Sequence, residues 1–146
     1  MNTTEKGDLA EQHVVLKALS NGWGVSVPIG RPAYDLIFDI KGQLLKIQVK
    51  AAWYEKDIDS YIVDARRTKT NRKVMVRKTY CENDFDFAIC YIFEKDIFYI
   101  FPIRVFRSYK SQIYLIEGVK RQRKPKSSIY KENWDLLSNY KSTDLQ

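Results

Sequence analysis

The chain is 146 residues long and 45% of its residues are apolar, which excludes a disordered protein and favours one globular domain over residues 1–146. Its formal net charge of +7 is unevenly spread: residues 1–65 carry 7 basic and 9 acidic side chains, whereas residues 66–146 carry 18 basic and 9 acidic ones. An acidic half joined to a basic half fits a protein that binds both a cation and a polyanion.

The first half of the chain alternates turn signals with short apolar segments. Thr3 or Thr4 can cap a helix that runs to about Ser20, where Asn21 and Gly22 are typical stop signals. The Lys41-Gly42 pair separates the apolar segments over residues 34–40 and 43–53 and predicts the tight turn of a hairpin. The predicted elements are a helix over residues 3–20 and strands over residues 24–27, 34–40, 43–53 and 60–65.

The second half of the chain contains the most apolar segments. Two of them are apolar on both faces, as expected of central strands or of strands covered by a partner subunit. Trp134 and Leu137 share one face of a short amphipathic helix near the C-terminus. The predicted elements are strands over residues 87–93, 97–103 and 112–116, a helical turn over residues 105–110 and a helix over residues 130–140. The layout predicts an α+β fold, in which a mixed β-sheet core is flanked by helices.

Four polar residues of the first half carry the chemistry that we expect of this chain. Apolar and polar residues alternate in the third predicted strand, so Gln48 and Lys50 lie on one face and Val49 on the other. Asp35 lies at the start of the neighbouring strand of the hairpin. Glu11 lies at the edge of the apolar stripe of the first helix, where an unpaired carboxylate is costly and a bound metal ion would offset that cost.

These residue types suit the hydrolysis of a phosphodiester. The carboxylates of Asp35 and Glu11, the amide oxygen of Gln48 and the backbone carbonyl of Val49 are hard oxygen ligands for Mg²⁺, with Mn²⁺ as the alternative. The cation would supply Lewis acidity and a nucleophilic water, and the Lys50 ammonium would stabilise charge on the phosphate. The alternative interpretation is an exposed glutamate and an aspartate that accepts turn hydrogen bonds.

Two basic segments of the second half are typical of contact with nucleic acid. Residues 66–78 contain seven basic residues and no acid, and predict a basic insertion that enters the major groove as a β-ribbon or loop. Residues 120–126 contain five basic residues in a predicted loop suited to the phosphate backbone. A solvated charged loop is the alternative. The residues expected to bind DNA are Arg66, Arg67, Lys69, Asn71, Arg72, Lys73, Arg77, Lys78, Lys120, Arg121 and Arg123.

The helix carboxylate Glu11, Asp35 after a proline-containing loop and the run Gln48-Val49-Lys50 together resemble the PD-(D/E)XK nuclease superfamily, above all the intron-encoded homing endonucleases of cyanobacteria. The resemblance implies a restriction-endonuclease-like fold and Mg²⁺-dependent DNA cleavage. It also implies that Asp35 is the principal metal ligand and that Lys50 lies near the scissile phosphate. The chain departs from the pattern at Gln48, which replaces an acidic residue and removes one negative charge.

We therefore expect a sequence-specific, double-strand DNA endonuclease of the homing type. A duplex has two antiparallel strands and one chain offers one site, so a homo-oligomer, either a dimer or a tetramer, is expected. The alternatives are a structure-selective nuclease such as a Holliday-junction resolvase, and a catalytically decayed DNA-binding module. We expect a cytoplasmic protein, because the chain has no signal peptide, no membrane-length apolar run and only two cysteines.

Overall fold

The structure is a computed structural model that describes residues 1–70, 75–118 and 124–141, and its mixed α+β architecture confirms the predicted fold class. The helices and strands are α1 (Thr3–Ser20), β1 (Gly24–Ser26), β2 (Leu36–Ile40), β3 (Gln43–Ala51), β4 (Trp53–Glu55), β5 (Ser60–Asp64), β6 (Arg66–Thr70), β7 (Met75–Thr79), β8 (Phe87–Ile92), β9 (Ile97–Pro102), α2 (Ile103–Ser108), β10 (Gln112–Leu115) and α3 (Asp135–Ser138). Two short 3-10 helices are η1 (Lys56–Ile58) and η2 (Lys126–Tyr130).

A five-stranded sheet in the order β1-β2-β3-β8-β9 forms the centre of the protein. Strands β1, β2 and β3 are antiparallel, and the predicted turn between β2 and β3 has positive φ at both Lys41 and Gly42, which suits the right-handed twist of a hairpin. Strand β8 pairs parallel with β3, so the chain must cross over between them, and β9 returns antiparallel. β4, β5 and β10 form a second, three-stranded sheet.

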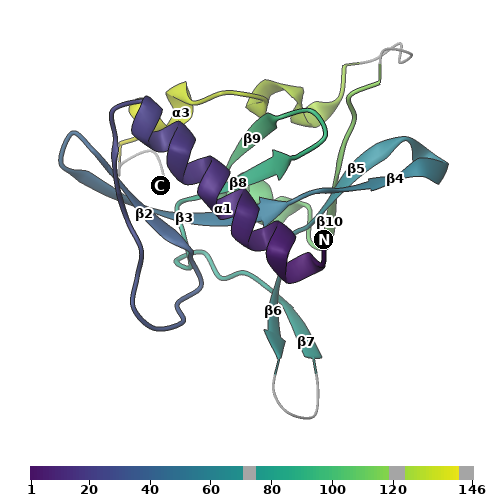
Figure 1. Ribbon diagram of the computed structural model, residues 1–146, viewed down its shortest axis with the longest axis horizontal. Coiled ribbons are helices and arrows are strands. Elements are labelled where there is room, and N and C mark those ends of the chain that lie inside the picture. Colours follow the sequence, from purple (N-terminus) through teal and green to yellow (C-terminus); the bar gives the residue numbers. More distant parts are fainter. Residues whose placement is uncertain (71–74, 119–123, 142–146) are drawn as a thin grey trace.

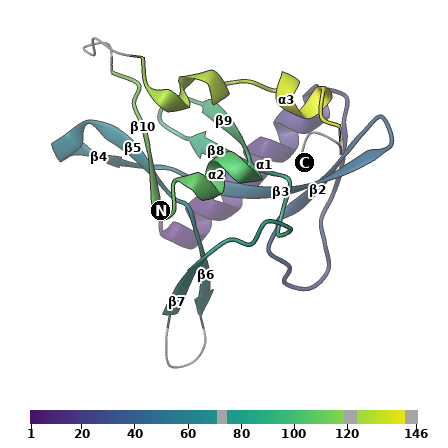
Figure 2. The ribbon, with the colours of Figure 1, turned by 180° about the vertical axis from the view of Figure 1, so that it is seen from behind.

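Apolar side chains are buried on both faces of the central sheet. On one face α1 packs with Ala10, Val14 and Ala18, which are fully buried because they recur every four residues on one side of the helix. On the other face β5, β10 and α2 cover the sheet, with Phe106 of α2 fully buried. Figures 1 and 2 show α1 and α2 on opposite faces of the sheet. Every residue of β8 is buried, which confirms its prediction as a central strand, whereas β9, for which the same was predicted, lies at the edge of the described sheet.

Several local expectations were wrong. Asn2 caps α1 in place of a threonine, and it does so through a reciprocal pair of hydrogen bonds with Glu5. The third predicted strand ends early, because the chain leaves the central sheet and β4 pairs with β5 instead. The helix predicted over residues 130–140 is confined to α3, because the backbone N–H of Glu132, a residue with positive φ, donates to the carbonyl of Phe98 on β9.

Strands β6 and β7 form a separate two-stranded ribbon that projects from the body of the protein (Figure 1). Its register places Arg66 opposite Thr79 and Arg67 opposite Lys78. The basic segment was predicted as a ribbon or a loop, and the described residues form a ribbon. Within the described ranges, no helix has both the length and the apolar character that crossing a membrane requires.

Candidate active site

Asp35 lies directly before β2 and is fixed to the neighbouring strand β3 at two points. Its backbone N–H donates to the carbonyl of Ile47 at 2.8 Å, and its Oδ2 accepts from the N–H of Val49 at 2.8 Å. Burial raises the pKa of the Asp35 carboxyl, while the Val49 hydrogen bond and the Lys50 ammonium act in the opposite direction. The carboxylate is therefore held in place, and its charge is incompletely compensated.

Glu11 brings a second carboxylate to the same place from helix α1. The side chain is partly buried at the edge of the apolar stripe of α1, as expected from its position in the helix. Its pKa is raised to about 7, chiefly by burial and then by the negative charges of Asp35 and Asp8. The structure thus brings Glu11 and Asp35 within electrostatic reach of each other. No described residue forms an ion pair with either one.

Gln48 and Lys50 lie on one face of β3, as the alternation of the strand predicts. Gln48 is buried, and its Nε2 donates to the backbone carbonyl of Val49 at 3.2 Å. Lys50 Nζ donates to the backbone carbonyl of Arg66 at 2.9 Å and lies 5.1 Å from the ring centroid of Tyr80. Burial lowers the pKa of the Lys50 ammonium, and nearby carboxylates, Asp64 first, partly offset this effect.

The oxygen atoms gathered here fit a hard divalent cation. They comprise the carboxylates of Asp35 and Glu11, the side-chain oxygen of Gln48 and the carbonyl of Val49, the types of ligand that such cations prefer. Two carboxylates that repel each other, without an ion-pair partner among the described residues, offer the excess negative charge that a cation would neutralise. In the described part of the chain, no group of three or more His, Cys, Asp or Glu side chains is arranged to hold a metal ion, and position 48 contributes an amide to this site in place of an acid.

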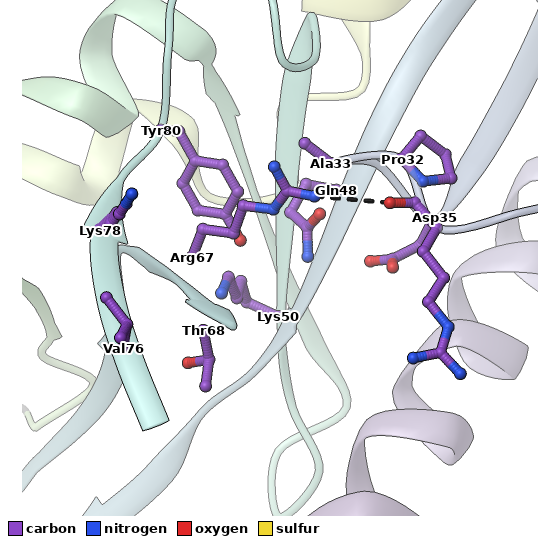
Figure 3. A pocket seen from close by; sticks show the side chains of 11 residues that line it. Pro32, Ala33, Asp35, Gln48, Lys50, Arg67, Thr68, Val76, Lys78 and Tyr80 are labelled. Carbon is purple, nitrogen blue, oxygen red and sulfur yellow. Dashed lines mark hydrogen bonds between the residues drawn. The ribbon is translucent and has the colours of Figure 1, made fainter. Parts of the chain in front are cut away.

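A cleft of about 760 Å³ opens over this group, between the start of β2, the face of β3 and the ribbon (Figure 3). Its floor contains Asp35, Gln48 and Lys50, and its far wall belongs to β6, β7 and the residue after them. The lining residues are Arg31, Pro32, Ala33, Asp35, Gln48, Lys50, Arg67, Thr68, Val76, Lys78 and Tyr80. Asp35, Gln48 and Lys50 are therefore accessible from the cleft, whereas Glu11 and Val49 are not among its lining residues.

Comparison with known proteins decides the family. A model of the PD-(D/E)XK endonuclease family matches residues 1–137. The chain belongs to the PD-(D/E)XK endonuclease family. Among solved structures, it is similar to a bacterial homing endonuclease, I-Ssp6803I, with 51% sequence identity, 95% of each chain covered and a TM-score of 0.89. No curated protein matches the chain. The predicted family and the prediction of a nuclease enzyme are confirmed.

The basic residues expected to bind nucleic acid divide into two groups in this PD-(D/E)XK endonuclease. Arg67 and Lys78 line the cleft. Arg66 and Arg77 instead form ion pairs with Asp64, at 3.1 and 3.6 Å, so part of their charge is already compensated. Of Lys69 only the backbone is described, and the remaining predictions lie outside the described residues: Asn71, Arg72, Lys73, Lys120, Arg121 and Arg123.

Three residues near the site of this endonuclease were missed in the sequence. Asp64 is the last acidic residue before the segment 66–78, which contains seven basic residues. This position in the sequence indicates an ion-pair partner for one of them. Arg31 was treated as part of a loop, although its carbonyl accepts a long hydrogen bond of 3.5 Å from Arg67. Tyr80 contacts Lys50 across a long stretch of chain, and no local pattern predicts such a contact.

Proposed function

We propose that the protein is a sequence-specific, Mg²⁺-dependent homing-type endonuclease that cuts both strands of a DNA duplex. The observation that carries this proposal is the convergence of Glu11 and Asp35 with Lys50 beside a cleft that has a basic ribbon on its far side. The likeness to a homing endonuclease at 51% identity over 95% of the chain supports the specific role in homing.

The metal ligands in this proposal are Asp35, Glu11, Gln48 and the carbonyl of Val49. When bound, Mg²⁺ supplies Lewis acidity at the phosphate and lowers the pKa of a coordinated water. Asp35 is already oriented by the N–H of Val49, so little reorganisation precedes binding. Binding also requires Glu11 to lose its proton, because a carboxyl group with a pKa near 7 is partly protonated at neutral pH.

Lys50 provides the positive charge that this site offers to the substrate. Its ammonium donates to one described acceptor, the carbonyl of Arg66, and an ammonium has three donors. A remaining N–H can therefore donate to a non-bridging oxygen of the scissile phosphate. Such preorganised donors stabilise charge that develops during phosphoryl transfer.

The ribbon is the proposed element of DNA recognition. A two-stranded β-ribbon fits the major groove, where arginine and lysine side chains contact phosphates and the edges of guanine. Arg67 and Lys78 face the cleft on neighbouring strands, which places them beside the duplex segment that enters the site. The other residues predicted to bind DNA are proposed as further DNA contacts on the basis of the sequence alone, and a homo-oligomer of two or four chains would present one site to each DNA strand.

Cleavage of a randomised plasmid library in Mg²⁺, followed by sequencing of the ends, tests this function. The wild-type protein should cut at one defined sequence and leave both strands broken. Asp35→Ala and Lys50→Ala should each cut at least about 100-fold more slowly, because each removes an electrostatic contribution of several kcal/mol, while duplex affinity is retained. Wild-type cutting by both variants, or preferential cutting of a four-way junction over linear duplex, would contradict the proposal.

One observation favours a second function, that of a decayed nuclease which only binds DNA. Gln48 leaves the site with two carboxylates, and no described group of three acids exists to hold a metal. Calorimetric titration with Mg²⁺ and Mn²⁺ separates the two functions. Binding that is lost in both Asp35→Ala and Glu11→Gln supports the endonuclease, and the absence of metal binding in the wild type supports the decayed module.

A further inference from the structure

Lys50 is held between the two ends of the ribbon. Its Nζ donates to the carbonyl of Arg66, the first residue of β6, at 2.9 Å. Its Nζ also lies 5.1 Å from the ring centroid of Tyr80, the residue that directly follows β7. Arg66 is paired with Thr79 in the register of the ribbon, and Tyr80 is the residue after this pair, so the two contacts come from the two chain segments at the base of the ribbon. The position of the Lys50 side chain therefore depends on both chain segments at the base of the ribbon.

The base of the ribbon is itself tied to the body of the protein through Asp64. This residue ends β5, and its Oδ1 accepts from the backbone N–H of Arg66 at 3.0 Å and from the Arg66 side chain at 3.1 Å. Its Oδ2 lies 3.6 Å from the guanidinium of Arg77 on β7. One partly buried carboxylate therefore joins both strands, and it does so close to the ammonium of Lys50.

The ring of Tyr80 has little freedom to move. Tyr80 is 3% exposed, and its ring packs edge-on against Phe85 at 5.0 Å and contacts Phe106 at 6.0 Å. Its backbone carbonyl accepts from Nε of Arg107 at 2.9 Å, which fixes the chain where the ribbon rejoins the core. A cation near a fixed aromatic ring is attracted by the electron density of the ring face.

We propose that Tyr80 is a positioning residue that, with the Arg66 carbonyl, holds the Lys50 ammonium in its cutting position and so couples the ribbon to cleavage. A lysine side chain that is free to rotate loses considerable conformational entropy when it must reach one phosphate oxygen. A displacement of about 1 Å can cost about 100-fold in rate. A ribbon that DNA has seated correctly therefore keeps the Arg66 carbonyl on the Lys50 ammonium, and a ribbon seated on the wrong sequence shifts this carbonyl relative to the fixed ring of Tyr80. This inference rests on the role proposed above for Lys50.

Two substitutions at Tyr80 separate positioning from mere packing. Tyr80→Leu removes the ring, whereas Tyr80→Phe retains it. In single-turnover assays with saturating enzyme and the cognate duplex, Tyr80→Leu should cut roughly 10- to 100-fold more slowly, and Tyr80→Phe should cut within about twofold of wild type. Duplex Kd should stay within about twofold for both, because the contact acts on the ammonium and not on the DNA. A wild-type rate in Tyr80→Leu, or a loss confined to Kd, overturns the proposal.

Phe106→Leu is the matched control for packing. It truncates a fully buried ring that contacts Tyr80 and lies in the same aromatic cluster. Urea denaturation of each variant gives the folded fraction, and rates are compared per folded molecule. Phe106→Leu should lose stability and keep its rate. An equal loss of rate in Phe106→Leu and Tyr80→Leu would show that packing alone is responsible, and the proposal would be wrong.

The remaining variants separate failure of this inference from failure of the proposed function. If Lys50→Ala cuts at the wild-type rate, the role proposed for Lys50 in the site is wrong, and the positioning role of Tyr80 is wrong with it. If Lys50→Ala is inactive and Tyr80→Leu is normal, the site stands and the positioning role fails. In the Lys50→Ala background, Tyr80→Leu should cause no further loss of rate, because a residue that acts through Lys50 has nothing left to position. Asp64→Asn should slow cutting in the same way as Tyr80→Leu, and an unaltered rate would exclude coupling through the base of the ribbon.

Discussion

The central sheet and the basic ribbon hold their side chains in opposite ways. The sheet buries β8 on both faces and fixes Asp35 to β3 through two hydrogen bonds, one from its backbone N–H to Ile47 and one that its carboxylate accepts from the N–H of Val49. The ribbon is solvated: all four described β7 positions from Val76 onward are exposed, and Arg67 lies opposite Lys78, an arrangement of like charges that disfavours the pair. A polyanion between such cations removes their repulsion. The proposed chemistry thus rests on a fixed frame, whereas the proposed DNA contacts lie on an exposed ribbon whose paired cations a polyanion would stabilise.

Truncation of one apolar side chain in each region should give the largest contrast in stability. Ile89→Ala, in the fully buried β8, should lower the free energy of unfolding by about 2–5 kcal/mol through the cavity that it leaves. Val76→Ala, on the exposed ribbon, should change it by less than about 0.5 kcal/mol. Urea denaturation measures both values. Similar losses in the two variants would show that the ribbon contributes to the same cooperative core.

Replacement of Gln48 by an acidic residue should strengthen metal binding at the central sheet. Gln48→Glu adds a third carboxylate to the site, so Mg²⁺ should bind roughly tenfold more tightly, since the number of charged ligands sets affinity for hard cations. Gln48→Leu, which removes the oxygen at similar size, should bind Mg²⁺ more weakly than wild type. Calorimetric titration orders the three proteins. Equal affinities would place Gln48 outside the ligand set.

The protonation of Glu11 should make stability depend on pH in the metal-free protein. Its pKa is about 7 in the folded state and 4.5 for the ordinary carboxyl, so between these values the folded state keeps a proton that the unfolded state has lost. Stability should therefore fall as pH rises from about 4.5 to 7, and thermal melts in a chelator measure this fall. Glu11→Gln should flatten the profile, and Asp35, whose pKa is also raised, acts in the same direction as Glu11. The affinity of the protein for Mg²⁺ should weaken as pH falls below about 7. A rise in metal-free stability across that window would contradict the arrangement.

The ribbon should give the smallest effect for a single substitution. Lys78→Ala should weaken binding to cognate and random duplexes by the same factor, and the slope of log affinity against log salt should fall by about 1. Lys95→Ala, in the exposed turn between β8 and β9, is the matched control and should leave both quantities unchanged. A loss restricted to the cognate sequence would instead identify Lys78 as a residue that reads a base.

Much of the site followed from periodicity, and the remainder depended on contacts between distant segments. Alternation along β3 predicted that Gln48 and Lys50 share a face, and the spacing of small apolar residues on α1 predicted the partly buried position of Glu11. The contact between Lys50 and Tyr80 had no such signal, because it depends on how the ribbon rejoins the core. The helix predicted near the C-terminus was too long, because periodicity contains no signal for the hydrogen bond from the N–H of Glu132 to β9.

The parallel pairing of β3 with β8 has an implication for how this nuclease could diversify. Parallel neighbours require a long crossover, and here residues 52–86 form it, including the whole ribbon. The ribbon leaves and re-enters this crossover at Arg66 and Thr79, which are directly paired. Because this pair fixes where the two strands of the ribbon meet the crossover, we expect variants with an exchanged outer segment to keep the register of β3 and β8. Under the role proposed above for the ribbon in DNA recognition, such exchanges would change the target sequence, provided that each graft preserves the Arg66–Thr79 pair.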